Sequence, residues 1–194
     1  MKENGREPEH ICVGCYVSPL GDVWIAASDQ GVRVMTVPAS TREDCLREVE
    51  RTASGEISLD EGGRVVERAI AELRAYFAGE LRQFSVPLDL RGTPFQQRVW
   101  RAVFDVPCGE VTTYREIALR IDAPNAYRAV GAANGANPAA IIVPCHRIVG
   151  SDGKLHGYGG GLHQKRALLD MEAGRQTFQN AEVSPSRSKI SFSS

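Results

Sequence analysis

Residues 11–37 alternate short apolar runs with turn-forming residues, a pattern that is typical of a sheet. Further along, Val66, Ile70, Leu73 and Phe77 recur at helical spacing and predict an amphipathic helix. We expect strands at residues 11–16, 23–27, 32–37 and 84–90, and helices at residues 41–51 and 63–78. This pattern predicts an N-terminal α+β domain at residues 10–88.

From residue 91 the pattern becomes mostly helical. Thr93 with Gln96, and Thr113 with Glu116, fit the capping box, in which two side chains bind backbone N–H groups at a helix start. We expect helices beginning at these two threonines, further helices at residues 126–134 and 162–172, and extended segments at 140–143 and 147–149. Two short helices joined by a tight turn indicate a helix-turn-helix. We therefore predict a winged-helix-like domain at residues 91–174, with disordered ends at residues 1–9 and 175–194.

The net charge of −1 does not by itself indicate a nucleic-acid partner. The charge is unevenly divided, because residues 1–90 carry 10 basic and 16 acidic side chains (−6) and residues 91–174 carry 10 and 7 (+3). A positive second half permits a polyanion site there. No apolar run reaches the roughly 18 residues needed to cross a bilayer, and the polar start is unlike a secretion signal. With five cysteines, an odd number for a disulfide framework, we expect reduced thiols and a cytoplasmic protein without membrane contact.

A cysteine followed directly by a histidine is the strongest chemical signal in the chain. Cys145 becomes a nucleophile as its thiolate, and the imidazole of His146 or a nearby cation would lower its pKa. Adjacent residues of an extended strand point to opposite faces, so direct contact requires a bend or a bridging water. Glu172, at the end of the last predicted helix, is a candidate to orient His146. Taken alone, the pair also fits a buried structural thiol beside a surface histidine.

The surrounding segments closely resemble the O6-alkylguanine-DNA alkyltransferases, also called methylated-DNA–protein-cysteine methyltransferases. The matching motifs are Gly92-Thr93-Pro94-Phe95-Gln96, Arg128-Ala129-Val130-Gly131, Asn137-Pro138, Pro144-Cys145-His146-Arg147 and Gly157-Tyr158-Gly159-Gly160-Gly161. The resemblance implies a ribonuclease-H-like α/β domain followed by the winged-helix-like domain. It also implies irreversible, single-turnover repair of O6-alkylguanine in double-stranded DNA, with O4-alkylthymine as a further candidate substrate.

The same resemblance assigns roles to matching positions. It implies that Cys145 accepts the alkyl group, that His146 acts as a base through a water, and that Glu172 orients His146. Asn137 matches a hinge residue, and Arg128 matches a finger that fills the stack vacated by a flipped base. We expect the substrate base to contact Tyr114, Ile148, Tyr158 and Gly159, and the DNA to contact Arg128, Tyr127, Ala129, Gly131, Thr113 and Arg115.

These roles agree with the physical demands of the reaction. A duplex hides O6 of guanine, so the base must be extruded before a protein nucleophile reaches it. Arg128, Gly131, Ala132 and Gly135 share one helical face, and small residues there let a helix approach the minor groove. The alternative for that face is close helix–helix packing.

Three positions depart from the family pattern, namely Tyr127, His156 and Gly159. Gly159 replaces a serine or alanine, which affects the alkyl groups that fit, and His156 replaces a common threonine. Tyr127 replaces a small residue beside the finger, which bears on DNA affinity. It could fold inward with Val130 and Asn134, but we favour a hydroxyl that reaches a DNA phosphate.

We expect no cofactor, no metal and a monomer. Cys12 and Cys15 lie three residues apart in a predicted strand, where their thiols point to opposite faces, so structural thiols are favoured over a metal site. One rival function is a lesion binder that does not transfer the alkyl group, but such proteins have the nucleophile replaced. Another is a cysteine hydrolase built on Cys145, His146 and Glu172, which would turn over repeatedly.

Overall fold

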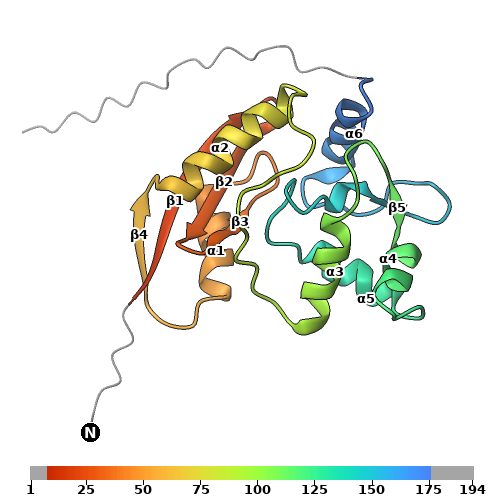
Figure 1. Ribbon diagram of the computed structural model, residues 1–194, viewed down its shortest axis with the longest axis horizontal. Coiled ribbons are helices and arrows are strands. Elements are labelled where there is room, and N and C mark those ends of the chain that lie inside the picture. The colour runs from red at the N-terminus through yellow and green to blue at the C-terminus, as the bar shows by residue number, and fades with distance from the viewer. Residues whose placement is uncertain (1–7, 176–194) are drawn as a thin grey trace, which may run out of the picture.

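The computed structural model describes residues 8–175, and its N-terminal part is built on a four-stranded sheet (Figure 1). The strands are β1 (Glu9–Ser18), β2 (Gly21–Ser28), β3 (Gly31–Met35) and β4 (Ile57–Glu61), in the order β3-β2-β1-β4. The first three pair antiparallel, and β4 runs parallel to β1. The predicted disordered ends lie outside the described residues except at Pro8, Glu9 and Arg175, and Glu9 is already the first residue of β1.

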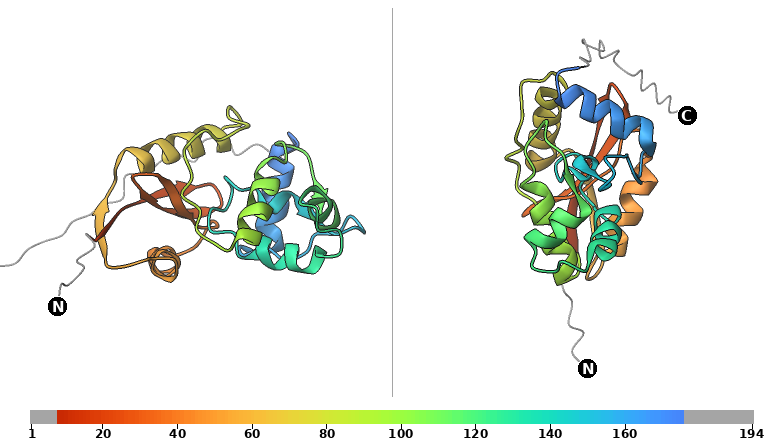
Figure 2. Two further views of the ribbon diagram at one scale, coloured as in Figure 1. Left: turned by 60° about the horizontal axis from the view of Figure 1, so that its bottom comes forward. Right: turned by 90° about the vertical axis from the view of Figure 1, so that its right-hand side faces the viewer.

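Two helices cover opposite faces of this sheet, α1 (Arg42–Arg51) and α2 (Arg64–Phe77) (Figure 2). In β1 and β2 alternating residues face each helix, as the period of two requires, whereas a register shift between β2 and β3 places Val32 and Val34 on different faces. The face under α1 buries Ile11, Val13, Ala26 and Val34 with Cys45 and Val49. The face under α2 buries Val23, Ile25, Val32 and Met35 with Val66, Leu73 and Phe77. The predicted stripe of the second helix is therefore confirmed as a core face.

The sheet differs from the prediction at two places. Residues 84–90 do not form a strand, because only Leu88 bridges to Val32 and the chain then continues toward the second domain. Pro87 has no N–H to extend such a ladder. The strand β4 was not predicted, because it is an edge strand with mostly exposed side chains and so lacks an apolar alternation.

The C-terminal part is mostly helical, with α3 (Pro94–Phe104), α4 (Tyr114–Arg120), α5 (Tyr127–Gly135) and α6 (Gly161–Glu172). Both predicted capping boxes are confirmed. At α3 the Gln96 N–H donates to Thr93 Oγ1 at 3.2 Å and the Thr93 N–H donates to Gln96 Oε1 at 2.9 Å. At α4 the Thr113 N–H donates to Glu116 Oε2 at 2.7 Å, and the Glu116 N–H donates to Thr113 Oγ1 at 3.1 Å.

The chain between α5 and α6 is less extended than predicted. Of residues 140–143, only Ala140 and Val143 form a bridge, which closes a tight turn, and Ile141 has a positive φ of 71°. Cys145–Arg147 is a 3₁₀ turn, η1, so Arg147 is not extended. The strand β6 (Ile148–Val149) follows and pairs parallel with β5 (Thr112–Thr113).

The two parts pack into one hydrophobic core that spans β2, β3, α2, α3 and the segment before η1. Met35 at the end of β3 extends the contact by hydrogen bonds, since its N–H donates to the Pro138 carbonyl and its carbonyl accepts from the Ala140 N–H, both at 2.8 Å. The Gln164 side chain of α6 donates to the Pro38 carbonyl. The edge of the sheet thus fixes the loop that leads to Cys145. Within residues 8–175 no helix is long and apolar enough to cross a membrane.

Candidate active site

Cys145 begins the 3₁₀ turn and is 7% exposed. Because these residues form a turn rather than a strand, the expectation of opposite strand faces does not apply, but no hydrogen bond joins the Cys145 thiol to His146, whose Nδ1 has no partner among residues 8–175. Asn137 holds the segment before it, because its Nδ2 donates to the Val143 carbonyl at 2.8 Å and its Oδ1 accepts from the Ala139 N–H at 3.0 Å. The position of Asn137 just after α5 therefore connects the helix-turn-helix to the turn that carries Cys145.

The Glu172 carboxylate lies at the C-terminal end of α6 and accepts hydrogen bonds from both residues that follow Cys145. His146 Nε2 lies 2.9 Å from Glu172 Oε1, and Arg147 donates through Nη2 to Oε1 at 2.7 Å and through Nε to Oε2 at 2.9 Å. The side chains of His146 and Glu172 are fully buried. Because an ionised carboxylate only accepts, we assign the proton to Nε2, which leaves His146 Nδ1 as an acceptor. That Nδ1 is buried and has no partner among residues 8–175.

The electrostatics of the cluster keep Glu172 charged and His146 neutral. Burial raises the pKa of Glu172, but hydrogen bonds from His146 and Arg147 and the Arg147 charge outweigh burial and hold this pKa far below its usual range. Burial is the main reason that the pKa of His146 is lowered. Burial also raises the pKa of the Cys145 thiol, against the Asn137 hydrogen bond and the Lys165 charge. A neutral imidazole beside a thiol is the resting arrangement of a nucleophile–base pair.

Lys165 is a member of this site that the sequence reasoning missed. Its side chain is fully buried, and Nζ donates to the carbonyl oxygens of Ile148 and His156, each at 2.7 Å. Burial lowers the pKa of Lys165 to about 8, and the thiolate form of Cys145 opposes this. The available signal was helical spacing, because Lys165 shares a buried stripe with Leu168 and Glu172.

A cleft of about 580 Å³ opens at Cys145. Tyr114, Gly131, Asn137, Tyr158 and Gly159 also line it. The Tyr158 hydroxyl is buried without a partner among the described residues, so it is free to bind a polar group that enters the cleft. A methyl group on Gly159 would lie 3.5 Å from Val37, an ordinary contact, so glycine leaves extra room there.

The structure does not bring every predicted substrate contact to the cleft. Ile148 is fully buried in β6 and is not among the residues that line the cleft. Its carbonyl oxygen accepts from Lys165, and its strand pairs with Thr112.

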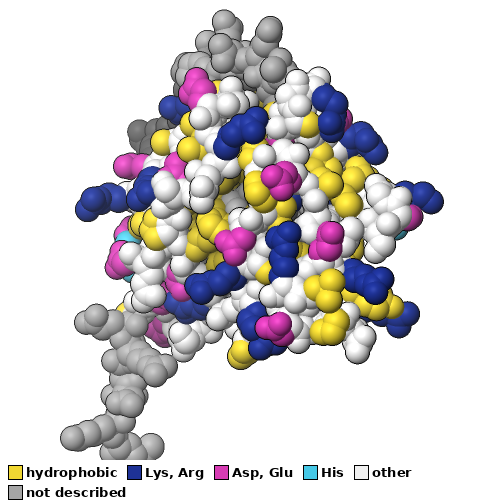
Figure 3. Space-filling model, turned by 45° about the vertical axis from the view of Figure 1, so that its right-hand side comes forward, with side chains coloured by type: hydrophobic (Ala, Val, Ile, Leu, Met, Phe, Trp, Pro, Cys, Tyr) yellow, Lys and Arg dark blue, Asp and Glu magenta, His cyan; other side chains and the backbone are white. Residues whose placement is uncertain are grey.

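A second groove adjoins the cleft on the surface of the helix-turn-helix. Tyr114 and Gly131 belong to both, and Arg115, Tyr127, Arg128 and His156 line the groove. The side chains of Arg115, Tyr127, Arg128 and Ala129 are exposed, whereas Thr113 is partly buried as the cap of α4. Figure 3 shows lysine and arginine side chains among apolar ones on the side of the molecule that bears the C-terminal helices.

Tyr127 points outward. It is 46% exposed, whereas Val130 and Asn134 are buried, so it does not fold inward with them. The Arg128 guanidinium lies 5.8 Å from the centre of the Tyr127 ring, which is cation–π distance. His156, the other departure in this groove, is exposed and lies 3.3 Å from Asp152 Oδ1.

The remaining cysteines lie away from this site or face other groups. Cys12 packs on the α2 side of the sheet and Cys15 lies near Cys45 on the α1 side, so their thiols point to opposite faces as predicted. Among residues 8–175 there is no group of three or more His, Cys, Asp or Glu side chains that could hold a metal ion.

The fold and the site together define a class of protein: a ribonuclease-like domain joined to a helix-turn-helix domain, with a buried cysteine at a cleft beside the exposed helix face. Family comparison agrees, because residues 11–90 match the 6-O-methylguanine DNA methyltransferase ribonuclease-like domain and residues 94–174 match the DNA-binding domain of the same family. The chain belongs to the 6-O-methylguanine DNA methyltransferase family.

Individual relatives support the family assignment. A methylated-DNA–protein-cysteine methyltransferase of Mycolicibacterium paratuberculosis is 49% identical over 80% of this chain and 88% of its own length. The enzyme of that name from Mycobacterium tuberculosis is 64% identical over 55% of this chain, and the aligned stretch spans 65% of its length, just under two thirds. The crystal structure of Mycobacterium tuberculosis OGT in complex with DNA superposes with a TM-score of 0.72 at 45% identity, covering 87% of this chain and 96% of that one.

Proposed function

We propose that this protein repairs DNA by moving an alkyl group from O6 of guanine to Sγ of Cys145, once per molecule. The observation that carries the proposal is the buried cysteine at a cleft, followed by a histidine that Glu172 holds at 2.9 Å. Family membership supports the same reaction, and the presence of Cys145 argues against a lesion binder without a nucleophile.

The proposed step balances without an oxidant or reductant. The thiol proton passes to His146 Nδ1, directly or through a water, while Nε2 keeps its hydrogen bond to Glu172. The Cys145 thiolate then attacks the alkyl carbon, an S–C bond forms, and the C–O6 bond breaks with its electron pair on the base. His146 gives up the proton that it took from the thiol, guanine takes up a proton at N1, and the restored base leaves the cleft within the DNA. Because a thioether is a poor leaving group, Cys145 is not regenerated.

Cys145 reaches its substrate only if the base leaves the duplex, since the thiol is buried and O6 is hidden in the stack. In our proposal Tyr114, Tyr158 and Gly159 bind the extruded base in the cleft. Arg128 fills the vacated stack from the adjoining groove, with Tyr127 beside it and Asn137 as the hinge. We further propose that Ala129, Gly131, Thr113 and Arg115 lie along the DNA. The backbone contact of Ile148 with the base, which the family resemblance implies, remains part of this proposal and requires the base to enter deeper than the residues that line the cleft, because Ile148 is fully buried.

The partners and boundaries are part of the same proposal. The partner is double-stranded DNA with O6-alkylguanine, bound by a single copy of the chain in the cytoplasm, where free thiols stay reduced. We propose domain limits at residues 10–88 and 91–174, and the family matches at 11–90 and 94–174 support them.

Intact-protein mass spectrometry tests the function. After incubation with duplex DNA that carries O6-methylguanine, the protein should gain one methyl group, about 14 daltons, on Cys145 and stop there. Cys145→Ala should gain nothing, and Cys108→Ala should behave like the parent protein. Repeated turnover would indicate a hydrolase, and the absence of any mass gain would indicate a lesion binder.

A further inference from the structure

The catalytic carboxylate has a hydrogen-bond donor from the other domain. Tyr76, on α2 over the ribonuclease-like sheet, donates through its hydroxyl to Glu172 Oε1 at 2.7 Å. The two residues are 96 positions apart, with 1% of Tyr76 and 4% of Glu172 exposed. The contact therefore exists only because the two domains pack together.

The oxygen that accepts from Tyr76 is the one that holds the histidine. Glu172 Oε1 accepts from Tyr76, His146 and Arg147, whereas Oε2 accepts from Arg147 Nε and from the Gly109 N–H. Donors that share one oxygen compete for its charge, and each bond weakens the pull on the others. The Tyr76 hydroxyl therefore reduces the charge that Glu172 presents to His146.

Packing within the first domain fixes this hydroxyl. The Tyr76 ring lies edge-on to Phe77, with centroids 5.3 Å apart, and against Phe84 at 5.4 Å. Burial, and then the Glu172 charge, raises the pKa of Tyr76 well above its ordinary value. The hydroxyl thus stays protonated and remains a donor over the pH range in which histidine titrates.

We propose that Tyr76 is a positioning residue of the repair reaction, through which the ribonuclease-like domain sets the basicity of His146. The proposal rests on the function proposed above. Without the hydroxyl, Glu172 Oε1 carries more charge and stabilises the protonated imidazole better. Proton transfer from Cys145 to His146 then becomes easier, so the thiolate forms at lower pH.

Several other charged or titratable groups influence the proton affinity of His146 and Glu172, and they remain in place when Tyr76 is replaced. The charged or titratable groups that face His146 and Glu172 are Arg147 and Cys145 on η1, Lys165 on α6, Cys108 before β5 and Tyr158 after β6. Because a tyrosine-to-phenylalanine change removes one oxygen and keeps the ring, it isolates the Tyr76 hydroxyl from this set.

The test compares Tyr76→Phe with Tyr16→Phe. Tyr16 is the matched control, because its ring also packs on Phe77, at 6.0 Å, and it lies on β1 away from Glu172. The rate at which iodoacetamide alkylates Cys145 is measured against pH by mass spectrometry. We expect the midpoint of this pH profile to be about one pH unit lower in Tyr76→Phe than in the parent protein. A shift of this size corresponds to part of the free energy of one charge-assisted hydrogen bond. Tyr16→Phe should keep the parent midpoint.

An unchanged midpoint in Tyr76→Phe, or an equal shift in Tyr16→Phe, would overturn the proposal. Iodoacetamide needs no alkylguanine chemistry, so this test holds even if the parent protein fails to react with O6-benzylguanine, an outcome that would count against the proposed function alone. Placing 3-fluorotyrosine at position 76 keeps the hydroxyl as a stronger donor, and it should move the midpoint to higher pH.

Nuclear magnetic resonance gives a readout independent of reactivity. Of the four histidines, only His146 is buried, so its N–H proton should be protected from exchange and separable from the others. We expect His146 to titrate at higher pH in Tyr76→Phe than in the parent protein. Titration at the parent pH would contradict the proposal.

Discussion

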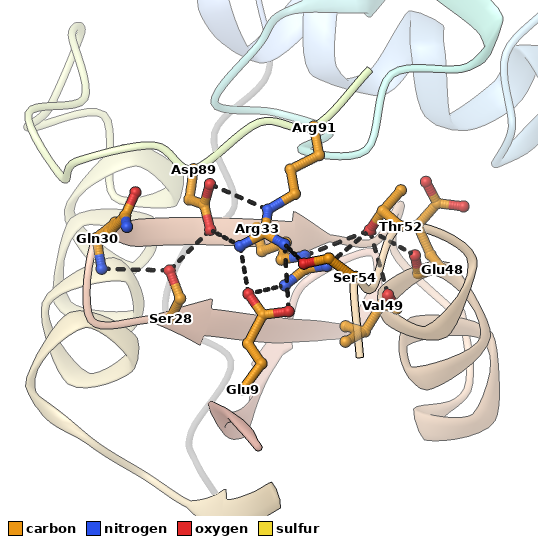
Figure 4. Close-up of polar contacts among 10 residues, drawn as sticks. All are labelled: Glu9, Ser28, Gln30, Arg33, Glu48, Val49, Thr52, Ser54, Asp89 and Arg91. Atoms are coloured by element: carbon orange, nitrogen blue, oxygen red, sulfur yellow. Dashed lines mark hydrogen bonds and ion pairs between the residues drawn. The ribbon is translucent and has the colours of Figure 1, made fainter. Parts of the chain in front are cut away.

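Among residues 8–175, two clusters of charge are centred on a buried ionised side chain, and only one of them has the groups for chemistry. In the first cluster, Arg33 of β3, 1% exposed, pairs with Glu9 at 2.5 Å, and Arg91 pairs with Glu9 and Asp89 (Figure 4). In the second, Glu172 accepts from Arg147, His146 and Tyr76. In each cluster a glutamate forms ion pairs with arginine and so links segments that are distant in the sequence.

The difference lies in what else each cluster contains. The first is made of carboxylates and guanidinium groups with hydroxyl partners such as Thr52, and it fastens the segment after the sheet to β1 and β3. Carboxylates and guanidinium groups keep their charge around neutral pH. The second adds a thiol and, one residue away, an imidazole whose Nδ1 has no partner in the part of the chain that the structure describes. A buried ion cluster is therefore not a site by itself. It becomes one when a group that can change its charge adjoins a nucleophile.

The largest expected difference between the clusters is in repair rate. Glu172→Gln should slow alkyl transfer by about a thousandfold, a typical loss for general acid–base catalysis, because an amide stabilises imidazolium poorly. Glu9→Gln should stay within about twofold of the parent, since Glu9 contacts no group of the site. The measurement is single-turnover transfer from O6-benzylguanine. A slow Glu9→Gln protein with normal folding would show that the first cluster also acts on the reaction.

The next difference is in stability. Arg147→Leu leaves the fully buried Glu172 without its cation, and breaking a buried pair in this way costs about 3–5 kcal/mol. Arg33→Leu should cost less, because Glu9 keeps its pair with Arg91 and its side chain is 18% exposed. Urea unfolding measures both. Equal losses would mean that the exposure of the remaining carboxylate does not decide the cost.

The sequence predicts the parts of the molecule whose causes are local. The capping boxes of α3 and α4 formed where Thr93 and Thr113 indicated, because a cap depends on residues within one helical turn. Family motifs indicated Cys145, His146 and Glu172, and the structure brings His146 and Glu172 into contact.

The parts that the sequence did not predict depend on tertiary packing. Apolar and polar residues alternate along residues 84–90 as in a strand, but this segment pairs with the sheet only through the bridge between Leu88 and Val32. Lys165 is an ordinary surface residue by type, and only the fold buries it against the Ile148 carbonyl. Tyr76 belongs to a core stripe whose spacing says nothing about a carboxylate in the other domain. Each of these features needs two distant segments to be placed together.

Acid should affect the two clusters differently. The pKa of Glu9 is lowered, chiefly by the Arg33 hydrogen bond against burial, and that of Glu172 is lowered further. A lowered carboxyl pKa stabilises the fold above its ordinary value of 4.5, and this stability is lost as pH falls below that value. His146, whose pKa burial lowers from 6.5, adds a loss that begins at higher pH in the second cluster only.

The unfolding free energy measured from pH 7 to pH 3 checks this prediction. The unfolding free energy should fall less steeply with acid in Glu172→Gln than in Glu9→Gln. In His146→Asn, the part of the fall in unfolding free energy that begins near pH 6.5 should be absent. A steeper decline in Glu172→Gln than in the parent protein would contradict the sign of the argument.

The smallest expected effect comes from removing one hydroxyl from each cluster. Thr52 Oγ1 accepts from Arg33 Nε and Nη2, both at 3.3 Å, and Thr52→Val keeps the shape of the side chain while removing that acceptor. Tyr76→Phe does the same to a donor of the second cluster. Each change should lower the unfolding free energy by about 1 kcal/mol, the net value of one hydrogen bond. Only Tyr76→Phe should also move the pH profile of Cys145, because only its partner carboxylate holds a histidine. If Thr52→Val moved that profile as well, the contrast between the clusters would fail, since a hydroxyl remote from His146 would then alter its proton affinity.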